Sequence, residues 1–200
     1  MEHAKWEAVV AEAARAFGRY GFKKTSMDDV ARGAGIAKGT LYLGCTSKRD
    51  LFYQAILRDL RLWNVELARQ IDPRVPADEL LVRVAQEAFA TVDRFPLARG
   101  LVMGEYDADI PDWADHLDEL RAFGMSTIQE LLRVGVRQGR FRAGLDLEET
   151  AGILLELITT TIGWNGRGPR AEERLARRGR ALVDVVLNGL LEPVAAIPSS

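Results

Sequence analysis

The chain has 200 residues, of which 48% are hydrophobic and 28% charged, and these ordinary globular values exclude a disordered or collagen-like protein. The single cysteine, Cys45, cannot form an internal disulfide, and no apolar run reaches the roughly 18 residues of a membrane span. The net charge of −2 is unevenly distributed along the chain. Residues 1–50 carry nine Lys or Arg against six Asp or Glu, whereas the remainder is acidic. We expect a cytoplasmic protein, without membrane association, whose basic head binds a polyanion.

Helical spacing runs through the whole chain, so we predict an all-α fold. Four N-terminal helices are expected: Trp6 to Gly21, Ser26 to Ala34, Ala37 to Leu43 and Ser47 to Ile71. Thr25 or Ser26 is positioned to cap the second helix, with an acid three residues later. After the two prolines of segment 72–76, five longer helices are expected at 77–94, 97–106, 111–138, 147–164 and 171–191.

Three residues near the N-terminus have the spacing of a helix-turn-helix. Ala31 is a small residue where two helices would cross, Gly35 suits a turn with positive φ, and Leu41 would anchor the second helix. The outward positions around them carry hydrogen-bond donors and cations, which suit phosphate contacts around a helix in the major groove. The sequence thus predicts a DNA-binding head.

The head resembles the DNA-binding domain of the TetR/AcrR transcriptional repressors. The resemblance covers about residues 5–53 and is carried by the run from Phe17 to Ala31, by Lys38-Gly39-Thr40-Leu41-Tyr42, and by Ser47-Lys48 with Leu51. It implies an N-terminal three-helix DNA-binding domain, here residues 1–50, followed by a helical-bundle domain for ligand binding and dimerisation, here 51–192. We expect residues 193–200 to form a disordered tail.

The same resemblance implies which residues would contact DNA. A phosphate would meet the start of the second helix, the recognition helix would lie in the major groove, and a lysine of the next helix would add a charge. The residues at these positions are Thr25, Ser26, Lys38, Gly39, Thr40, Tyr42 and Lys48.

The head departs from the family pattern at three positions. Gly44 and Cys45 replace the usual aromatic pair, and Ala37 replaces the Ser or Thr that caps the recognition helix. Because glycine costs about 1 kcal/mol in a helix, we expect the recognition helix to fray at its C-terminal end. We predict Cys45 to be a buried apolar filler, with a redox role as the alternative.

The C-terminal part contains two further candidate sites, each with an ordinary core or intramolecular packing as the alternative interpretation. By analogy with the family, an effector cavity for a lipophilic or aromatic molecule would be lined by Trp63, Phe89, Met103, Tyr106, Trp113, Phe123 and Trp164. Apolar stripes on the last two helices predict a homodimer interface containing Ile158, Ile162, Leu175, Leu182, Val186 and Leu190.

No pattern of catalytic residues is present, so we predict that the chain is not an enzyme and needs no metal or cofactor. The acidic run from Asp107 to Asp115 has Asp112 where a calcium loop needs glycine, and no phosphate-binding glycine loop occurs. The sequence favours a ligand-responsive transcriptional regulator, with repression as the family default, that binds a palindromic operator. The alternative is a small-molecule carrier or sequestering protein that binds DNA only non-specifically.

Overall fold

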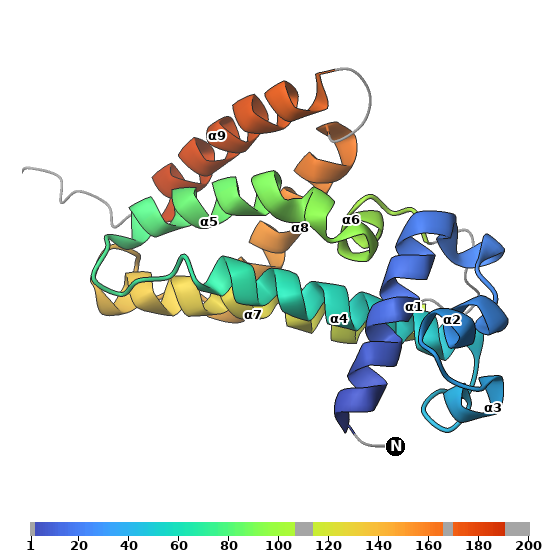
Figure 1. Ribbon diagram of the computed structural model, residues 1–200. Coiled ribbons are helices and arrows are strands. Elements are labelled where there is room, and N and C mark those ends of the chain that lie inside the picture. Colours follow the sequence, from blue (N-terminus) through green and yellow to red (C-terminus); the bar gives the residue numbers. More distant parts are fainter. Residues whose placement is uncertain (1–2, 107–113, 166–169, 191–200) are drawn as a thin grey trace, which may run out of the picture. The chain divides into compact units, whose positions relative to one another are not determined.

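The computed structural model describes residues 3–106, 114–165 and 170–190, and their regular structure is helical with no β-strand (Figure 1). None of the described helices combines the length and apolar character needed to cross a bilayer. The helices are α1 (His3–Lys24), α2 (Met27–Gly33), α3 (Lys38–Leu41), α4 (Lys48–Ala68), α5 (Ala77–Thr91), the short 3-10 helix η1 (Val92–Arg94), α6 (Pro96–Val102), α7 (Ala114–Arg137), α8 (Leu147–Asn165) and α9 (Ala171–Leu190). The all-α prediction is confirmed.

Several predicted helix ends shift for local reasons. The first helix is interrupted at Gly21, which has a φ of 79°, and resumes through Lys24. The third is shorter than predicted, since α3 ends at Leu41. The predicted segment 77–94 divides into α5 and η1, and α6 begins at Pro96, where a missing N–H does no harm. The segment predicted as a tail and the acids Asp107, Asp109 and Asp112 lie outside the described residues.

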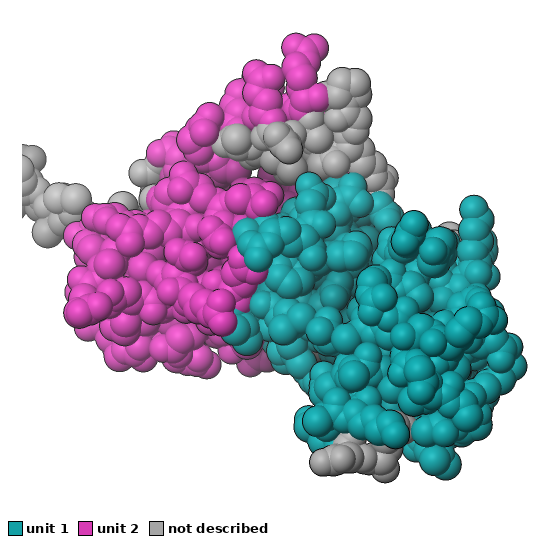
Figure 2. All heavy atoms as spheres, viewed as in Figure 1, with its two compact units in different colours: residues 1–65, 91–123 teal, residues 66–90, 124–200 magenta. Residues whose placement is uncertain are grey.

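The chain divides into two compact units, coloured separately in Figure 2. The first unit contains residues 1–65 and 91–123, and the second contains 66–90 and 124–200. The first unit therefore includes α6 together with the whole predicted DNA-binding head. The predicted division into domains at residue 50 stays a prediction.

An aromatic cluster forms much of the core of the first unit. The ring of Phe52 on α4 lies 4.9 Å from that of Phe17 on α1, 5.1 Å from Phe22 and 5.1 Å from Tyr106, measured between centroids. Edge-on contacts of this kind add about 0.5 to 1.5 kcal/mol each beyond the burial of apolar area. The cluster fixes α1 against α4 and thereby positions the shorter helices α2 and α3.

Helix α6 is attached to both long helices of the first unit. Pro96 lies against Gly18 of α1, where a Cβ would be 2.8 Å from the proline Cγ. The buried carboxylate of Asp59 on α4 accepts a hydrogen bond of 3.0 Å from the N–H of Leu97. Burial raises the pKa of Asp59, and the bond from Leu97 opposes that shift. Asp59 is thus the N-terminal hydrogen-bond acceptor that holds α6 on α4.

The second unit is held by a hairpin of α8 and α9 and by polar contacts at the end of α7. Gln138 accepts a 2.9 Å hydrogen bond from the N–H of Ala77 and donates to the carbonyls of Pro73 and Val75, both at 2.8 Å. Arg140 binds both carboxylate oxygens of Asp78. These contacts fix the two-proline segment and the start of α5 to the end of α7.

Asp59 provides a test of the α6 attachment. Asp59→Ala removes the acceptor and leaves a buried N–H unpaired, so we expect it to lower the free energy of unfolding by about 1 to 3 kcal/mol. Asp59→Asn keeps an acceptor oxygen and is expected to cost less. Urea unfolding at pH 7 measures both.

The pH dependence separates the charge of Asp59 from its hydrogen bond. Because its pKa in the folded chain is raised above the ordinary 3.8, the folded state holds the proton more tightly than the unfolded state. Its contribution to stability is therefore greatest in acid and declines as the pH rises from about 3.8 through the raised value. Asp59→Asn should remove that decline; an unchanged pH profile would contradict the assignment.

Candidate nucleic-acid interface

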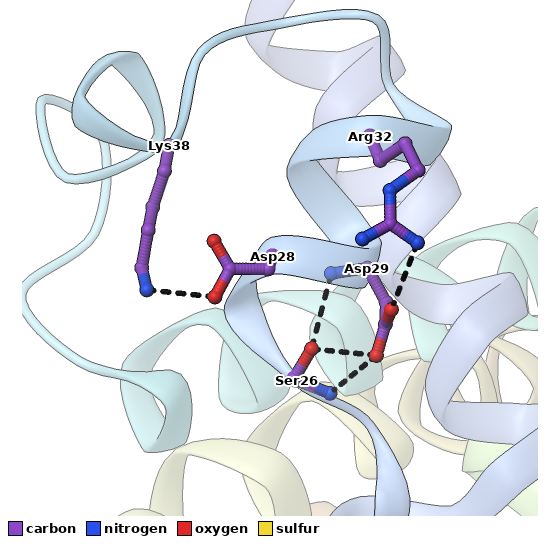
Figure 3. Close-up of polar contacts among 5 residues, drawn as sticks. All are labelled: Ser26, Asp28, Asp29, Arg32 and Lys38. Atoms are coloured by element: carbon purple, nitrogen blue, oxygen red, sulfur yellow. Dashed lines mark hydrogen bonds and ion pairs between the residues drawn. The ribbon is translucent and has the colours of Figure 1, made fainter.

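Helix α2 begins at a complete capping box. Ser26 Oγ accepts a hydrogen bond of 3.1 Å from the Asp29 N–H, and the Asp29 carboxylate accepts one of 3.3 Å from the Ser26 N–H (Figure 3). Ser26 Oγ also donates to Asp29 Oδ2 at 2.5 Å. Hydrogen bonds from Ser26 hold the pKa of Asp29 below its usual range. A seven-residue helix has little stability of its own, so this box defines where α2 starts.

The turn between α2 and α3 follows the predicted chemistry. Gly35 has a φ of 66°, in the region that favours glycine, and Ile36 donates its N–H to the Ala31 carbonyl at 3.0 Å. Ala31 is buried where α2 and α3 meet, and Leu41 is completely buried below α3. The three residues that predicted the helix-turn-helix therefore occupy the expected positions.

Helix α3 presents its remaining residues outward. It consists of Lys38, Gly39, Thr40 and Leu41, with Tyr42 as the C-terminal cap. Lys38, Gly39 and Tyr42 are exposed and Thr40 is half-buried, so these four surround the buried anchor Leu41. Ala37 precedes the helix without a side-chain cap, as its identity predicts.

Two residues expected to meet a phosphate are used within the chain. Thr25 is buried, and its hydroxyl lies 2.9 Å from the Gly21 carbonyl and 3.2 Å from that of Ala16. It satisfies a carbonyl released by the break in α1, so the structure corrects the expectation that its side chain faces solvent. Ser26 remains exposed, but its hydroxyl belongs to the capping box.

Lys48 connects the start of α4 to the end of α1. Its Nζ donates to the Lys23 carbonyl at 3.3 Å and lies 4.5 Å from the centroid of the Phe22 ring. Partial burial lowers the pKa of Lys48. Ser47 Oγ caps α4 by accepting the Asp50 N–H at 3.1 Å, as predicted. These contacts with Lys23 and Phe22 thus hold the Lys48 ammonium in a defined position.

Lys38 forms an ion pair that the sequence reasoning missed. Its Nζ lies 2.8 Å from Asp28 Oδ2, which joins the first turn of α2 to the first residue of α3 (Figure 3). The hydrogen bond to Asp28 raises the pKa of Lys38. The sequence contains a signal for this ion pair. Asp28 and Asp29 are adjacent, and a capping box uses only one carboxylate, so the other is available to pair with a cation.

Gly44 has a role that the comparison with the family pattern did not predict. A Cβ at Gly44 would lie 2.5 Å from the indole of Trp6, so the missing side chain leaves room for that ring. Trp6 Nε1 donates to Gln54 Oε1 at 2.9 Å, and Gln54 Nε2 donates to the Gly44 carbonyl at 3.2 Å. Trp6 therefore belongs to the support of the recognition helix as well as to the apolar stripe of α1.

Cys45 is buried, as predicted, and its thiol lies 3.4 Å from the Leu41 carbonyl. Burial raises the pKa of Cys45 to about 11, which keeps the sulfur in its unreactive thiol form at neutral pH. This favours the apolar filler over the redox alternative.

A second group of cations lies on the surface of the head. A surface cleft of about 470 Å³ between α1 and α2 contains four cations and two carboxylates in its lining. Arg15 pairs with Glu12, and Arg32 lies 3.5 Å from Asp29. The lining residues are Glu12, Arg15, Ala16, Arg19, Tyr20, Lys24, Asp29, Arg32 and Gly33.

The candidate effector residues are divided between the two compact units. Trp63, Met103, Tyr106 and Phe123 belong to the first unit, whereas Phe89 belongs to the second, where it lies against Gly179. Trp63 and Met103 are buried, and Trp63 Nε1 donates to Thr91 Oγ1 at 3.1 Å. Tyr106 donates to the Leu97 carbonyl at 3.2 Å. Trp113 and the side chain of Trp164 lie outside the described residues.

The candidate dimer residues differ in exposure. Ile158, Leu182 and Val186 are half-buried, whereas Ile162 is completely buried within its own chain and offers no surface to a partner in this structure. The side chains of Leu175 and Leu190 lie outside the described part. Exposed apolar residues of the same stripes lie nearby in sequence, namely Ile153, Leu157 and Val185.

A capped short helix, a glycine turn and an anchored helix that displays donors outward define a helix-turn-helix DNA-binding protein of the transcription-regulator class. Residues 9–55 match the model of the bacterial regulatory proteins of the tetR family. The chain is 26% identical to the HTH-type transcriptional repressor BepR of Brucella suis biovar 1, over 96% of this chain and 94% of that protein. The head is therefore similar to the DNA-binding domain of the TetR-family regulators, and the chain as a whole is similar to HTH-type transcriptional repressors.

Solved structures support the same fold. The regulator FadR of Bacillus subtilis, in complex with stearoyl-CoA, has a TM-score of 0.70 at 16% identity, over 92% of this chain and 99% of that one. A Saccharomonospora viridis regulator in complex with choline has a TM-score of 0.69 at 22% identity, over 96% of this chain and 100% of that one. Both neighbours have the two-part helical architecture predicted here.

Gly44 gives a test of how the recognition helix is supported. Gly44→Ala places a methyl group against the indole of Trp6, so we expect a loss of about 1 to 3 kcal/mol in the free energy of unfolding. Gly144→Ala is the matched control, because nothing lies within 4 Å of its Cβ position. Denaturant unfolding followed by circular dichroism compares the two; equal effects would contradict the proposed contact between Gly44 and Trp6.

Proposed function

We propose that the chain represses transcription as a homodimer that binds a palindromic operator through α2 and α3 and leaves it when a small lipophilic or aromatic molecule binds. In this proposal residues 1–50 bind DNA, and residues 51–192 bind the effector and form the dimer. The observation that carries the proposal is the anchored display of α3: Leu41 is completely buried, while Lys38, Gly39 and Tyr42 point outward around it. That arrangement suits a helix that enters a major groove.

Gly39 supports contact with DNA because nothing in the described part of the chain requires a glycine there. No heavy atom lies within 4 Å of its Cβ position, and its φ is not in the glycine region. Glycine in a helix is nevertheless about 1 kcal/mol less favourable than alanine. A close approach of another molecule to the α3 backbone gives a reason for the missing side chain.

The remaining proposed contacts have separate roles. Thr40 and Lys38 would face base edges or the backbone, Tyr42 would donate its hydroxyl to a phosphate, and Lys48 would bring a fixed charge. Ser26 would present the start of α2, where backbone N–H groups favour an anion. Thr25 supports the site from within, since its hydroxyl is bound to backbone carbonyls.

A homodimer is supported by apolar surface on α8 and α9. Val185 is 71% exposed, Ile153 56% and Leu157 40%. Exposed apolar residues that lie together are typical of an interaction surface, because a partner that covers them removes apolar area from water. Pairing of the same surfaces in two copies would bury them, and a dimer that binds successive major grooves needs its recognition helices about 34 to 36 Å apart, one turn of B-DNA. We therefore extend the proposed interface to these three residues.

The effector part of the proposal rests on the aromatic character of the C-terminal region and on the neighbours. The FadR structure contains stearoyl-CoA and the Saccharomonospora viridis structure contains choline, so related folds accept organic ligands of different sizes. In this chain Tyr106 and Phe123 are incompletely buried aromatic residues of the first unit, and Arg61 lies 5.9 Å from the Phe123 ring centroid. Incompletely buried aromatic rings of this kind suit contact with an apolar or aromatic ligand.

Selection of bound duplexes from a random DNA pool tests the proposal directly. We expect an inverted repeat whose half-sites are one helical turn apart, bound at least about a thousandfold more tightly than random DNA at moderate salt. Affinity by fluorescence anisotropy and mass by light scattering complete the measurement. Binding without sequence preference would favour the carrier alternative, and a monomer on a single half-site would contradict the dimer.

The selected duplex is also the probe for the effector. Titration of a long-chain acyl-CoA or an aromatic compound into the protein and operator complex should weaken DNA binding, by about 5- to 150-fold for a typical coupling energy. A compound that stabilises the protein thermally without weakening operator binding would support ligand binding but overturn ligand-controlled release.

Gly39→Ala separates the proposed DNA contact from folding. The added methyl group meets open space, so we expect the free energy of unfolding to rise by up to about 1 kcal/mol while operator affinity falls at least tenfold. Gly152→Ala on α8 is the matched control, since a Cβ there makes an ordinary contact of 3.7 Å with Met125 Sδ. It should change stability in the same direction and leave DNA binding intact. Unchanged operator affinity of Gly39→Ala would show that α3 does not approach DNA at this position.

A further inference from the structure

Asp28 is a carboxylate in the most basic part of the chain. Between Arg15 and Arg49 the sequence has eight Lys or Arg and only two acids, Asp28 and Asp29. The capping box of α2 accounts for Asp29, whose side chain holds the helix start. Asp28 takes no part in that box. A carboxylate on a surface that meets phosphates lowers affinity for all DNA unless a cation compensates it.

The cation that compensates Asp28 belongs to the recognition helix. Lys38 is the only charged residue of α3, and its Nζ lies 2.8 Å from Asp28 Oδ2 (Figure 3). The side chains are 51% and 56% exposed, so the ion pair lies at the surface rather than in the core. A surface ion pair contributes little to the stability of the folded chain, so this pair is not needed to hold α3 in place. The free protein therefore holds its recognition-helix cation in a weak intramolecular contact.

We propose that Asp28 is a specificity-determining residue, which holds the Lys38 ammonium in the free protein so that Lys38 adds little to the binding of random DNA and contributes fully only at a matching base edge. This inference rests on the proposed DNA-binding function. Asp28 lies on α2, outside the recognition helix, and through the ion pair it determines how much Lys38 contributes to DNA binding.

The physical reason is the difference between phosphates and base edges as competitors for Lys38. Every sequence offers phosphates, but a Lys38 that moves to a phosphate leaves Asp28 uncompensated in a field of negative charge. An ammonium has three N–H donors, so Lys38 can keep Asp28 on one of them and donate another to an acceptor such as guanine O6 or N7. Asp28 thus penalises the non-specific contact more than the specific one.

Four variants test this on the full chain: Asp28→Asn, Lys38→Met, the double variant, and Glu148→Gln as a control for net charge. Glu148 is an exposed acid in the first turn of α8, in the other compact unit. The measurement is the dissociation constant for the selected operator and for a random-sequence duplex of equal length, over a series of salt concentrations. Thermal unfolding by circular dichroism verifies folding, and Asp28→Ser replaces Asp28→Asn if the amide variant folds poorly.

We expect Asp28→Asn to bind the random duplex about three- to fivefold more tightly, with a smaller gain on the operator, so that preference for the operator falls. The salt dependence on random DNA should steepen by about one phosphate equivalent. In the Lys38→Met background the same change at Asp28 should no longer reduce preference, and Glu148→Gln should leave preference unchanged.

Three results would overturn the inference: equal gains on both duplexes, a change no larger than that of Glu148→Gln, or the same loss of preference when Lys38 is absent. Each of these requires that the wild-type chain binds its operator. A wild-type chain that binds no duplex would instead contradict the proposed function, so the two failures are distinguishable.

Discussion

The recognition helix of this protein cannot exist without its neighbours. α3 has four residues, which is one turn, and nucleation of so short a helix in isolation is unfavourable. Its conformation depends on burial of Leu41, on the positive φ of Gly35 in the preceding turn and on the close approach of the Trp6 indole to Gly44. The surface of α3 that we propose to contact DNA is therefore a product of tertiary packing, and α1 and α4 are as necessary to it as the residues it displays.

That dependence explains why the helix itself contains so few stabilising features. Ala37 provides no side-chain cap, Gly39 is unfavourable in a helix, and Lys38 at the first position opposes the helix dipole. Each of these residues reduces local stability and leaves a surface that another molecule can approach. The support lies beneath and around α3, where Leu41 and Cys45 are buried and Gln54 bonds to the Gly44 carbonyl. Local instability on the outer side and dense packing on the inner side are the pattern expected at a functional surface.

The sequence predicted the architecture because helical periodicity and caps are local signals. Ser26 with Asp29, Gly35, Ser47 and the two-proline segment all have the positions expected of them. What could not be predicted depends on which side chains meet across distant segments. Trp6 is 38 positions from Gly44, and the space left by the glycine in the turn after α3 cannot be assigned to a particular ring elsewhere without the fold. For the same reason Thr25 looked like an exposed phosphate ligand, although the break at Gly21 turns its hydroxyl inward.

The arrangement of the first unit also bears on how an effector would reach the DNA-binding helices. Helix α6 belongs to the same compact unit as α1 to α3, and it contacts α1 through Pro96 and Gly18 and α4 through Leu97 and Asp59. Because Gly18 has no side chain, the Pro96 ring lies directly against the backbone of α1, and a shift of α6 is transmitted to α1 through this contact. A ligand that binds one position of α6 better than another would thus change the position of α1, and with it the orientation of α2 and α3 that the aromatic cluster around Phe52 fixes. The coupling needs no long pathway, because the contact between α6 and the head is direct.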